Sequence, residues 1–518
     1  MTSLWLDEQR ERIPSDTFET GARYDVVVAG AGLTGLTTAL LLARAGLTVT
    51  VLEARFVGAV TTGHTTAKLS LLQGGVLSGI RSRGSDHVLK AYVEGNREGQ
   101  AWMLRYLDER GVDVQRRDAF TYAGTPAGIE SLDAEYEACH AADLDVERLD
   151  DPGLPFETHG ALRLRDQAQF DPMDVLRALA ADLRSRGGTI VEGARVKDVD
   201  TGEPSRVVTS LGDVFAGTVV LATGIPILDR GLYFAKVKPS RSYAQAFRVP
   251  DAALPQGMYL SIDSPGRSLR TAPVGGEELL VVGGNGHTVG REPDTQQLVD
   301  DLESWTTQRF PGAERTHAWS AQDYESMNLV PFVGWMPRTG KHVALATGYN
   351  KWGMTNAVAA ALSISADVLD GDISWAKTLH HRITLPQDVA HSAVANAEVA
   401  RDLASGWASA ELHALPDDAP EEGDGVVGRD GIRPVAMSTV DGTVCRLSAV
   451  CTHLGGIVSW NSAEQSWDCP LHGSRFDAQG RLIEGPAVED LRAVDEPELP
   501  GDEHEPVEDV EEGPQNPG

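Results

Sequence analysis

The sequence predicts an α/β protein with an added antiparallel sheet and a separate C-terminal module. A strand, a glycine-rich turn, a helix and a second strand can be read in order between Tyr24 and Arg55. After Gly224, several short segments alternate apolar and polar residues with period two, which is typical of an antiparallel sheet. Beyond the linker PDDAPEEGDG, two cysteine–histidine pairs lie within residues 451–472. A chain of 518 residues is therefore expected to form two or three domains.

The N-terminal unit has the pattern of a dinucleotide-binding site. Val26–Val28 form a β-branched run of the kind buried in a parallel sheet, and an alanine- and leucine-rich helix is expected from about Leu36 to Ala45. Gly46 ends this helix, and Leu47–Leu52 form the second strand. Because the free N–H groups at the start of such a helix bind phosphate, the unit predicts a nucleotide cofactor.

Three glycines and one carboxylate make this prediction more specific. The glycines have G-x-G-x-x-G spacing: the first forms the turn, the second admits a pyrophosphate close to the backbone, and the third lets the helix pack on the strand. They are Gly30, Gly32 and Gly35. Glu53 ends the second strand, where a carboxylate holds a ribose hydroxyl. A glycine triplet alone is a weak signal, but together with both strands, the helix and the acid it is a strong one.

Two later segments with glycine turns favour FAD over NAD as the cofactor. Thr218–Gly224, TVVLATG, reads as a strand and turn, and Val343–Asp370 reads as a strand, a glycine turn and a helix. With these segments, residues 22–385 resemble the glycine/D-amino acid oxidase family of FAD-dependent oxidoreductases. The resemblance implies a two-dinucleotide-binding-domain flavoprotein fold with FAD, and an antiparallel-sheet substrate domain at about 225–330. It also implies that the late helix points its N-terminus at the pyrimidine edge of the flavin.

The same resemblance assigns residues to the cofactor and to the substrate side. Those expected to contact FAD, besides the fingerprint glycines and Glu53, are Thr65, Thr66, Val196, Gly224, Gly348, Gly353 and Met354. Tyr349, Lys351 and Trp352 lie in the turn nearest the flavin and are the candidate catalytic residues. Lys351 could hold charge on the flavin or a water near N5, and Trp352 could line the substrate pocket. The alternative for Lys351 is a solvated lysine.

His64 lies eleven residues after the ribose-binding acid. It matches the histidine that carries covalent flavin in the dimethylglycine dehydrogenase branch of this family. There a tryptophan precedes the histidine, whereas here the preceding residue is Gly63. The alternative is a histidine that contacts the flavin without a covalent bond or caps the loop.

Several other residues are expected to be structural. Residues 85–185 read as mostly helical, and Cys139 within them is expected to be a buried small residue. Four polar residues stand out in the antiparallel region, and each is expected more often at the surface or in a structural role than in contact with substrate. They are Arg241, Tyr243, Arg270 and His287.

The C-terminal module carries a metal-binding pattern. Cys451 and His453 form a C-x-H pair, and Cys469 and His472 form a C-x-x-H pair after fifteen intervening residues. Two thiolates and two imidazoles would also suit zinc. However, the loops CTHLGG and CPLHGS resemble the two cluster loops of Rieske domains. That resemblance implies a small all-β domain, at about 424–497, whose 2Fe-2S cluster has the cysteines on one iron and the histidines on the other.

Departures from the Rieske pattern bear on the reduction potential. High-potential Rieske proteins carry an extra cysteine in each loop, joined by a disulfide, and a tyrosine that donates a hydrogen bond to a cluster cysteine. Those positions here are Gly456, Leu471 and Phe476, and only Ser474 of the hydrogen-bonding set remains. Gly485–Ala487 matches the proline loop over the cluster. Fewer hydrogen bonds to the sulfurs make the reduced cluster harder to form, so a low potential is predicted.

Composition limits the partners and the location. The formal net charge of -31 argues against nucleic acid or an acidic membrane surface as a partner. Four cysteines do not make a disulfide framework, and neither a secretion signal nor a membrane span is recognised. A cytoplasmic protein is expected.

Three segments remain. Residues 1–22 are interpreted as an N-terminal surface arm, residues 386–423 as a linker region with a polar helix from Val389 to Ser409, and residues 498–518 as an acidic disordered tail.

The two modules together predict a function. A flavin accepts a hydride and a Rieske centre carries one electron at a time, so their combination converts two-electron chemistry into one-electron transfer. The leading hypothesis is a dehydrogenase of amines or amino-acid-like substrates that passes electrons through the cluster to a soluble one-electron carrier. The alternatives are a reductase that takes electrons inward from a ferredoxin-like donor, and a non-catalytic redox sensor.

Overall fold

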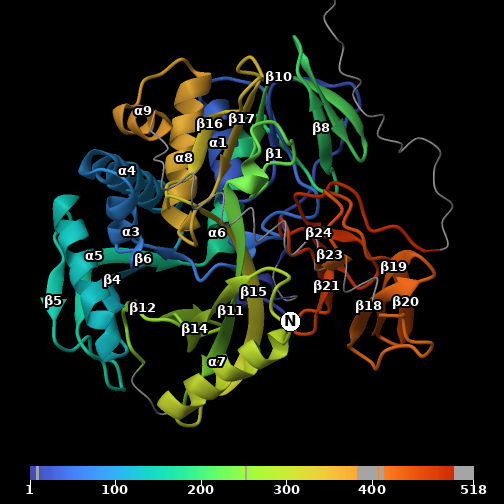
Figure 1. Ribbon diagram of the computed structural model, residues 1–518. Coiled ribbons are helices and arrows are strands. Elements are labelled where there is room, and N and C mark those ends of the chain that lie inside the picture. The colour runs from blue at the N-terminus through green and yellow to red at the C-terminus, as the bar shows by residue number, and fades with distance from the viewer. Residues whose placement is uncertain (8–10, 251–253, 382–405, 408–412, 495–518) are drawn as a thin grey trace, which may run out of the picture.

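Two large sheets and a small C-terminal module make up the chain (Figure 1). The computed structural model describes residues 1–7, 11–250, 254–381, 406–407 and 413–494. The first sheet contains the dinucleotide-binding unit, the second lies beneath it in Figure 1, and the module lies at the side of both. No helix of these described residues is long and apolar enough to cross a membrane.

The dinucleotide sheet has the strand order β16-β17-β10-β1-β2-β7, with β9 and β8 added beside β10. Strands β7, β2, β1, β10 and β17 are parallel, and β16 joins the edge antiparallel. Their bounds are β1 (Arg23–Ala29), β2 (Val49–Leu52), β7 (Thr189–Val191), β8 (Val196–Asp200), β9 (Ser205–Thr209), β10 (Gly212–Leu221), β16 (Phe332–Trp335) and β17 (Val343–Thr347). The valine-rich strands are buried on both faces, as a parallel sheet requires.

Helices cover this sheet and connect its strands. α1 (Leu33–Arg44) follows the glycine turn and packs against α8 (Gly353–Val368) and α6 (Pro172–Ser185). α4 (Asp86–Arg110) packs on the outer side of α8 and contacts α9 (Ser374–His380). The early glycine turn and the late glycine turn are thus brought together by contact between the two helices that follow them.

The second sheet has the order β15-β11-β14-β13-β12-β4-β6-β3, with β5 beside β6. Helix α7 (Thr295–Arg309) packs on β14 and β11. The strand bounds are β3 (Lys68–Leu69), β4 (Val114–Tyr122), β5 (Glu147–Leu149), β6 (Ala161–Phe170), β11 (Val237–Arg248), β12 (Met258–Ser261), β13 (Arg267–Val274), β14 (Glu277–Thr288) and β15 (Glu314–Ser326). The substrate domain was predicted at about 225–330. The sheet also contains residues from earlier in the chain, because β12 pairs with β4.

The prediction of a mostly helical region at 85–185 is therefore only partly correct. α4, α6 and α5 (Ile129–Ala141) are helices, but β4, β5 and β6 lie between them. About half of the residues of β4 are only partly buried, so polar side chains are tolerated on both faces of this strand. Its sequence is VQRRDAFTY. Its apolar pattern is therefore weak. Cys139 is buried on α5, as expected.

The start of the chain is not a surface arm. Leu4–Leu6 form a 3-10 helix, and Leu4 and Trp5 are buried in the main core. The Ser3 hydroxyl donates a hydrogen bond to the carbonyl oxygen of Gly63 at 2.6 Å. The indole N–H of Trp5 donates to the carbonyl oxygen of Thr65, also at 2.6 Å. These first residues thus fasten the loop that contains His64.

The C-terminal module consists of two small antiparallel sheets. β18 (Gly425–Asp430), β19 (Arg433–Val440) and β20 (Thr443–Ser448) form one; β21 (Ser459–Asn461), β22 (Ser466–Asp468), β23 (Arg475–Asp477) and β24 (Leu482–Glu484) form the other. Their core contains Trp467, Phe476 and the two loop cysteines. The predicted helix at Val389–Ser409, apart from residues 406–407, and the tail at 498–518 lie outside the described residues.

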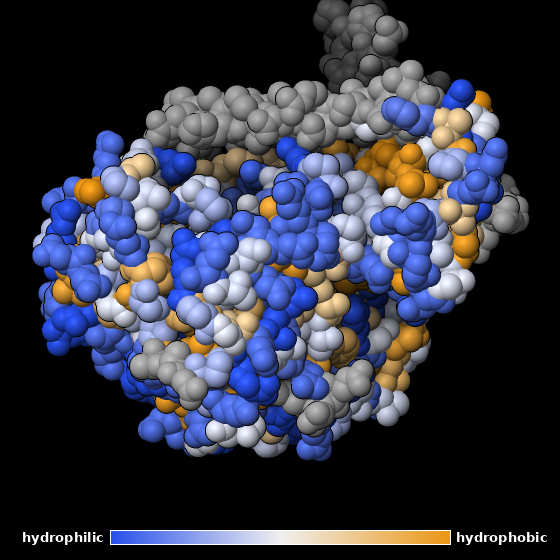
Figure 2. All heavy atoms as spheres, turned by 90° about the horizontal axis from the view of Figure 1, so that it is seen from below, coloured by the Kyte–Doolittle hydropathy of each residue, from blue (hydrophilic) through white to orange (hydrophobic). Residues whose placement is uncertain are grey.

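The surface agrees with the charge of the chain. Figure 2 shows one face covered mostly by hydrophilic residues, with apolar residues in small scattered groups. The sequence has 76 acidic and 45 basic residues, so acidic side chains outnumber basic ones among its charged residues.

Candidate functional site

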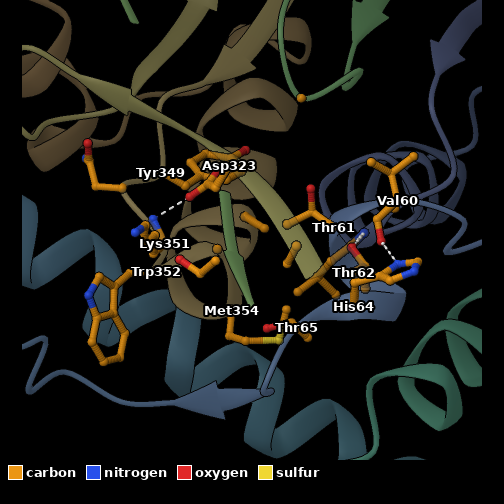
Figure 3. A pocket seen from close by; sticks show the side chains of 18 of the residues that line it. Val60, Thr61, Thr62, His64, Thr65, Asp323, Tyr349, Lys351, Trp352 and Met354 are labelled. Atoms are coloured by element: carbon orange, nitrogen blue, oxygen red, sulfur yellow. Dashed lines mark hydrogen bonds between the residues drawn. The ribbon is translucent and has the colours of Figure 1, made fainter. Parts of the chain in front are cut away.

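One cavity connects all three parts of the molecule. It has a volume of about 640 Å³ and is lined by the glycine turn, the loop after β2, the late glycine turn, the second sheet and the C-terminal module. Figure 3 shows the loop residues Thr61–Thr65 on one side and the turn residues Tyr349–Trp352 on the other. The cavity lies at the carboxyl ends of β1 and β2, where open parallel sheets bind their ligands.

The fingerprint glycines are required by close packing. Gly30 has φ +104°, and a Cβ placed on it would lie 2.5 Å from the carbonyl oxygen of Ala222. A Cβ on Gly35 would lie 1.9 Å from the carbonyl oxygen of Gly30, so only glycine allows α1 to meet β1. Gly32 and Leu33 line the cavity at the N-terminus of α1. Backbone N–H groups at this end are available to a pyrophosphate.

Glu53 ends β2 at the cavity wall. Its carboxylate accepts hydrogen bonds from the backbone N–H groups of Ala31 at 2.8 Å and Arg55 at 2.9 Å. Burial raises the pKa of Glu53, and these two backbone donors oppose the shift. Val196 and Gly224, both predicted from the family resemblance, line the same cavity. The carboxylate is thus fixed next to the glycine turn, as a ribose contact requires.

His64 closes the short helix α2 (Thr61–His64) in the loop after β2. Burial lowers the pKa of its imidazole to about 4, so the ring is neutral at pH 7. Its Nδ1 lies 2.7 Å from the carbonyl oxygen of Val60 (Figure 3) and, in the neutral ring, donates its proton there. Nε2 consequently keeps a free lone pair. His64, Thr65 and Thr66 all line the cavity, and their contact with FAD stays a prediction.

The late glycine turn supplies the opposite wall. The Tyr349 hydroxyl lies 2.9 Å from the Thr34 hydroxyl, which ties this turn to α1, and its burial raises the pKa of the phenol. Trp352 precedes α8, and Gly353 and Met354 begin that helix beside the cavity. Gly348, at φ +80°, does not line the cavity; it forms the turn.

Lys351 lines the cavity, but its side chain is partly exposed. Its side chain is 41% exposed and its Nζ lies 3.8 Å from a Glu325 carboxylate oxygen. Its backbone N–H, in contrast, donates to the carboxylate of Asp323 (Figure 3). The side chain thus lies between the cavity and solvent, and the role of Lys351 at the flavin stays a prediction.

Asp323 and Lys68 are among the charged residues that line the cavity but were not predicted. Burial raises the pKa of Asp323 to about 6, so this carboxyl group titrates close to neutrality. Lys68 is buried on β3 without a carboxylate partner in the described part of the chain. A single lysine within the otherwise uncharged run TTAKLSLL was the available sequence signal. Of the four polar residues noted in the antiparallel region, only Tyr243 lines the cavity.

The cysteines and histidines of the C-terminal module form two pairs. Cys451 and Cys469 are free and buried, and the Cys451 thiol pKa is lowered chiefly by a hydrogen bond with the Cys469 thiol. The rings of His453 and His472 lie edge to face with centroids 5.1 Å apart. Nowhere in the described residues do three or more metal-binding side chains converge on one point. Two separate pairs suit a two-iron cluster, in which sulfides complete each iron, better than a closed four-ligand zinc site.

The residues around these pairs lie where the differences from high-potential Rieske proteins were predicted. A Cβ on Gly456 would lie 2.6 Å from Leu471 Cδ1, so the two positions where a disulfide could join the loops are in contact but hold no cysteine. The Ser474 hydroxyl accepts a hydrogen bond from the Ala487 N–H at 3.0 Å and contributes to lowering the pKa of the Cys451 thiol. Phe476 is fully buried in the same core. The indole of Trp407 donates to the carbonyl oxygen of Gly455 at 3.0 Å.

The module is docked through its histidines. His453 Nε2 lies 3.2 Å from a carboxylate oxygen of Asp229, which belongs to the flavin-binding part of the chain. The ring of Phe234 meets both imidazoles edge-on, with centroids 5.5 Å from His453 and 4.8 Å from His472. The side chain of His453 is only 8% exposed. The histidine edge of the site therefore faces the rest of the protein.

A second set of contacts fixes the module to β11 and β15. Arg241 binds both carboxylate oxygens of Glu464, at 2.5 and 3.0 Å, with its guanidinium buried. The Gln322 amide donates to the carbonyl oxygen of Gly473 at 2.8 Å, and the Tyr324 hydroxyl to that of Gly485 at 3.2 Å. Residues 483–485 and 487–488 in turn line the cavity. The loop over the metal site is thus also a wall of the nucleotide cavity.

A nucleotide cavity of this fold, joined to paired cysteine and histidine ligands, defines a flavin- and iron–sulfur-dependent oxidoreductase. The FAD dependent oxidoreductase family, DAO, matches residues 25–366, and the Rieske [2Fe-2S] domain matches residues 414–495. The chain belongs to the DAO family and carries a C-terminal Rieske domain. Its cofactors are accordingly FAD and a 2Fe-2S cluster.

One relative matches nearly the whole chain, and others match a short stretch of it. The putative Rieske 2Fe-2S iron-sulfur protein YhfW of Bacillus subtilis is 32% identical over 482 residues, which cover 91% of this chain and 93% of that protein. Cytochrome b6-f complex iron-sulfur subunit 1 of Nostoc is 53% identical over 45 residues, only 9% of this chain and 25% of that subunit. The second similarity therefore concerns part of the Rieske domain alone.

Solved structures resemble the flavin-binding part. Glycine oxidase from Geobacillus kaustophilus matches with a TM-score of 0.57 at 18% identity, over 68% of this chain and 96% of that one. L-proline dehydrogenase from P. horikoshii also matches at 0.57, with 16% identity, over 70% of this chain and 97% of the other. At these identities the likeness establishes the fold.

Proposed function

We propose that this protein is a dehydrogenase of amines or amino-acid-like substrates that delivers electrons singly, through its Rieske cluster, to a soluble carrier. The observation that carries the proposal is the shared wall: residues of the Rieske module line the cavity of the flavin site. When bound, FAD accepts a hydride and the cluster exchanges one electron at a time. The similar glycine oxidase and proline dehydrogenase structures support an amino-acid-like substrate.

Asp323 supports the amine class. An amine that arrives as its ammonium ion must lose one proton before its carbon can release a hydride, and a buried carboxylate can accept that proton. The pKa of about 6 leaves most of Asp323 ionised at pH 7 and close enough to neutrality for proton exchange. Its position in the cavity, next to Tyr349 and Lys351 in Figure 3, makes it a better candidate base than Lys351.

An anaerobic screen of amines and amino acids tests the proposal. A true substrate is expected to bleach the flavin and then to produce the electron-spin signal of a reduced Rieske cluster, without any added reductant. If no compound bleaches the flavin but a reduced ferredoxin does, the enzyme works as a reductase and the proposal is wrong. If neither reduces the flavin, the sensor alternative replaces it.

A further inference from the structure

Lys68 is a buried cation without a counter-ion. The residue is 8% exposed, and its Nζ is bonded only to two hydroxyl groups, Thr66 Oγ1 at 3.1 Å and Ser268 Oγ at 2.5 Å. It makes no ion pair with any carboxylate of the described chain. Buried lysines are rare unless they are paired, since removing an ammonium group from water is costly. An unpaired one next to a cavity therefore calls for a ligand.

A second buried cation makes the absence of a carboxylate more significant. Arg270, 1% exposed, donates from its Nη1 to the carbonyl oxygens of Thr66 at 2.8 Å and Ala67 at 3.0 Å. Burial first, and then repulsion from Arg270, lowers the pKa of Lys68 to about 7. Two neighbouring cations create a positive potential that the protein itself does not neutralise at Lys68.

The position of Lys68 is held firmly. Ala67 lies in the left-handed region at φ +51°, which is uncommon for a residue with a side chain and must be maintained by its surroundings. The two carbonyl oxygens bound by Arg270 flank that residue on one side, and β3 pairs with β6 on the other, with Lys68 opposite Gln169. The lysine is thus placed before any ligand arrives, which lowers the entropic cost of binding.

Lys68 and both of its hydroxyl partners line the flavin cavity. Lys68 and Ser268 come from β3 and β13 of the second sheet, whereas the glycines expected to bind the FAD pyrophosphate come from β1 and α1. The cation therefore approaches the cavity from the second sheet and not from the glycine turn expected to bind the pyrophosphate.

We propose that Lys68, with Ser268 and Thr66, forms a binding subsite for a carboxylate of the substrate. The inference rests on the proposed function and narrows it, because it selects amino acids over simple amines. The carboxylate supplies the counter-ion that Lys68 lacks, and the two hydroxyl groups orient the ammonium group toward it. A simple amine offers Lys68 no counter-ion and lacks this charge-assisted contact, so it should bind more weakly.

Binding of small probes to the FAD-loaded protein tests the subsite without turnover. Benzoate and acetate are compared with benzamide and acetamide while the visible spectrum of the oxidised flavin is recorded. The wild type is expected to respond saturably to the carboxylates and not to the amides. K68M should weaken carboxylate binding at least about tenfold, equivalent to about 1.4 kcal/mol, and K68R should recover part of it.

Matched variants show whether Lys68 itself binds the carboxylate. K90M removes an exposed lysine paired with Asp143 on α4 and should bind carboxylates like the wild type. If K68M fails to fold, S268A, which removes one hydroxyl partner, should still weaken carboxylate binding several-fold. The proposal is overturned if the wild type ignores carboxylates, if K68M binds them equally well, or if K68M instead loses FAD, which would assign the cation to the cofactor. Carboxylate binding that depends on Lys68 would stand even if no amine were ever oxidised.

Discussion

His64 shows how much one side chain depends on its backbone. Its Nδ1 proton is held by Val60 and its carbonyl oxygen accepts from the Trp319 indole at 2.7 Å, so the neutral ring keeps one orientation. The lone pair on Nε2 is the atom that a covalent flavin bond would use.

The covalent hypothesis for His64 can be decided by acid precipitation. A covalent bond predicts that the yellow colour stays in the precipitated wild-type protein and moves to the supernatant in H64A. Colour that leaves the wild-type protein completely would show that the flavin is held by contacts alone.

Phe476 tests the argument about the reduction potential. The missing disulfide and tyrosine hydroxyl predict a midpoint nearer roughly -150 mV than +300 mV. In F476Y, a new hydrogen bond to a cluster cysteine that favours the reduced state by about 1 kcal/mol would raise the midpoint by about 40 mV. Redox titration followed by electron-spin resonance measures both values, and F476L serves as the matched control. A wild-type midpoint well above roughly +100 mV would contradict the argument.

The sequence predicted those candidate site residues that belong to short motifs with a fixed spacing. The glycine turn, Glu53 and both cysteine–histidine pairs lie in short stretches where one chemical requirement sets the pattern. Lys68 and Asp323 could not be predicted because their environment comes from strands far away in the chain. Ser268, the closest partner of Lys68, lies 200 residues later.

Among the elements, the long strands β11 and β15 connect the two halves of the molecule. They pair along their whole length and carry Arg241 and Gln322, which hold the Rieske module. Strands β4 and β6 were harder to recognise, since their pairing partners are also distant and their faces are partly polar.

The Arg241–Glu464 ion pair is expected to stabilise the protein in a pH-dependent manner. Burial alone would raise the pKa of Glu464, but Arg241 and Arg475 hold it far below its ordinary value. Stability from this group is therefore fully present above the unfolded-state pKa, about 4.3, and is lost as the pH falls toward the folded-state value.

Replacement of Arg241 by methionine should accordingly cost about 3 kcal/mol of unfolding free energy at pH 7, because Glu464 would lose a buried partner. The difference from wild type should shrink as the pH falls below about 4. Urea unfolding at several pH values measures it. R248M, which breaks an exposed pair with Glu277, should cost less than about 1 kcal/mol. Equal effects of both variants would contradict a special role for the buried pair.

At the scale of the whole molecule, the docked histidine edge leads us to expect electron exchange within a single chain. Asp229 and Phe234 contact the two ligand histidines directly, and the residue pairs are more than 200 positions apart, which is why the sequence could not reveal this interface. The local motifs of the sequence predicted the flavin part and the Rieske part, but not how these two parts contact each other.

Internal transfer has a kinetic signature. After photochemical reduction of the flavin, the cluster should become reduced with a first-order rate that does not depend on protein concentration. F234A should slow this step, while F120L, a change on β4 of the second sheet where the ring stacks on Tyr259, should leave it unaltered. A rate proportional to protein concentration would show that electrons pass between molecules instead.

The cavity wall that runs from Ala29 to Val488 also has a consequence for biosynthesis. A ribosome releases the glycine turn hundreds of residues before it releases the loop over the cluster. The pocket therefore cannot be completed before the Rieske domain has been synthesised, and stable flavin loading must wait for that domain. Because the last part of that wall belongs to the iron–sulfur domain, a cell short of iron would be left with a nascent flavoprotein whose pocket closes poorly. Assembly of the 2Fe-2S cluster would thus determine how well the protein retains FAD.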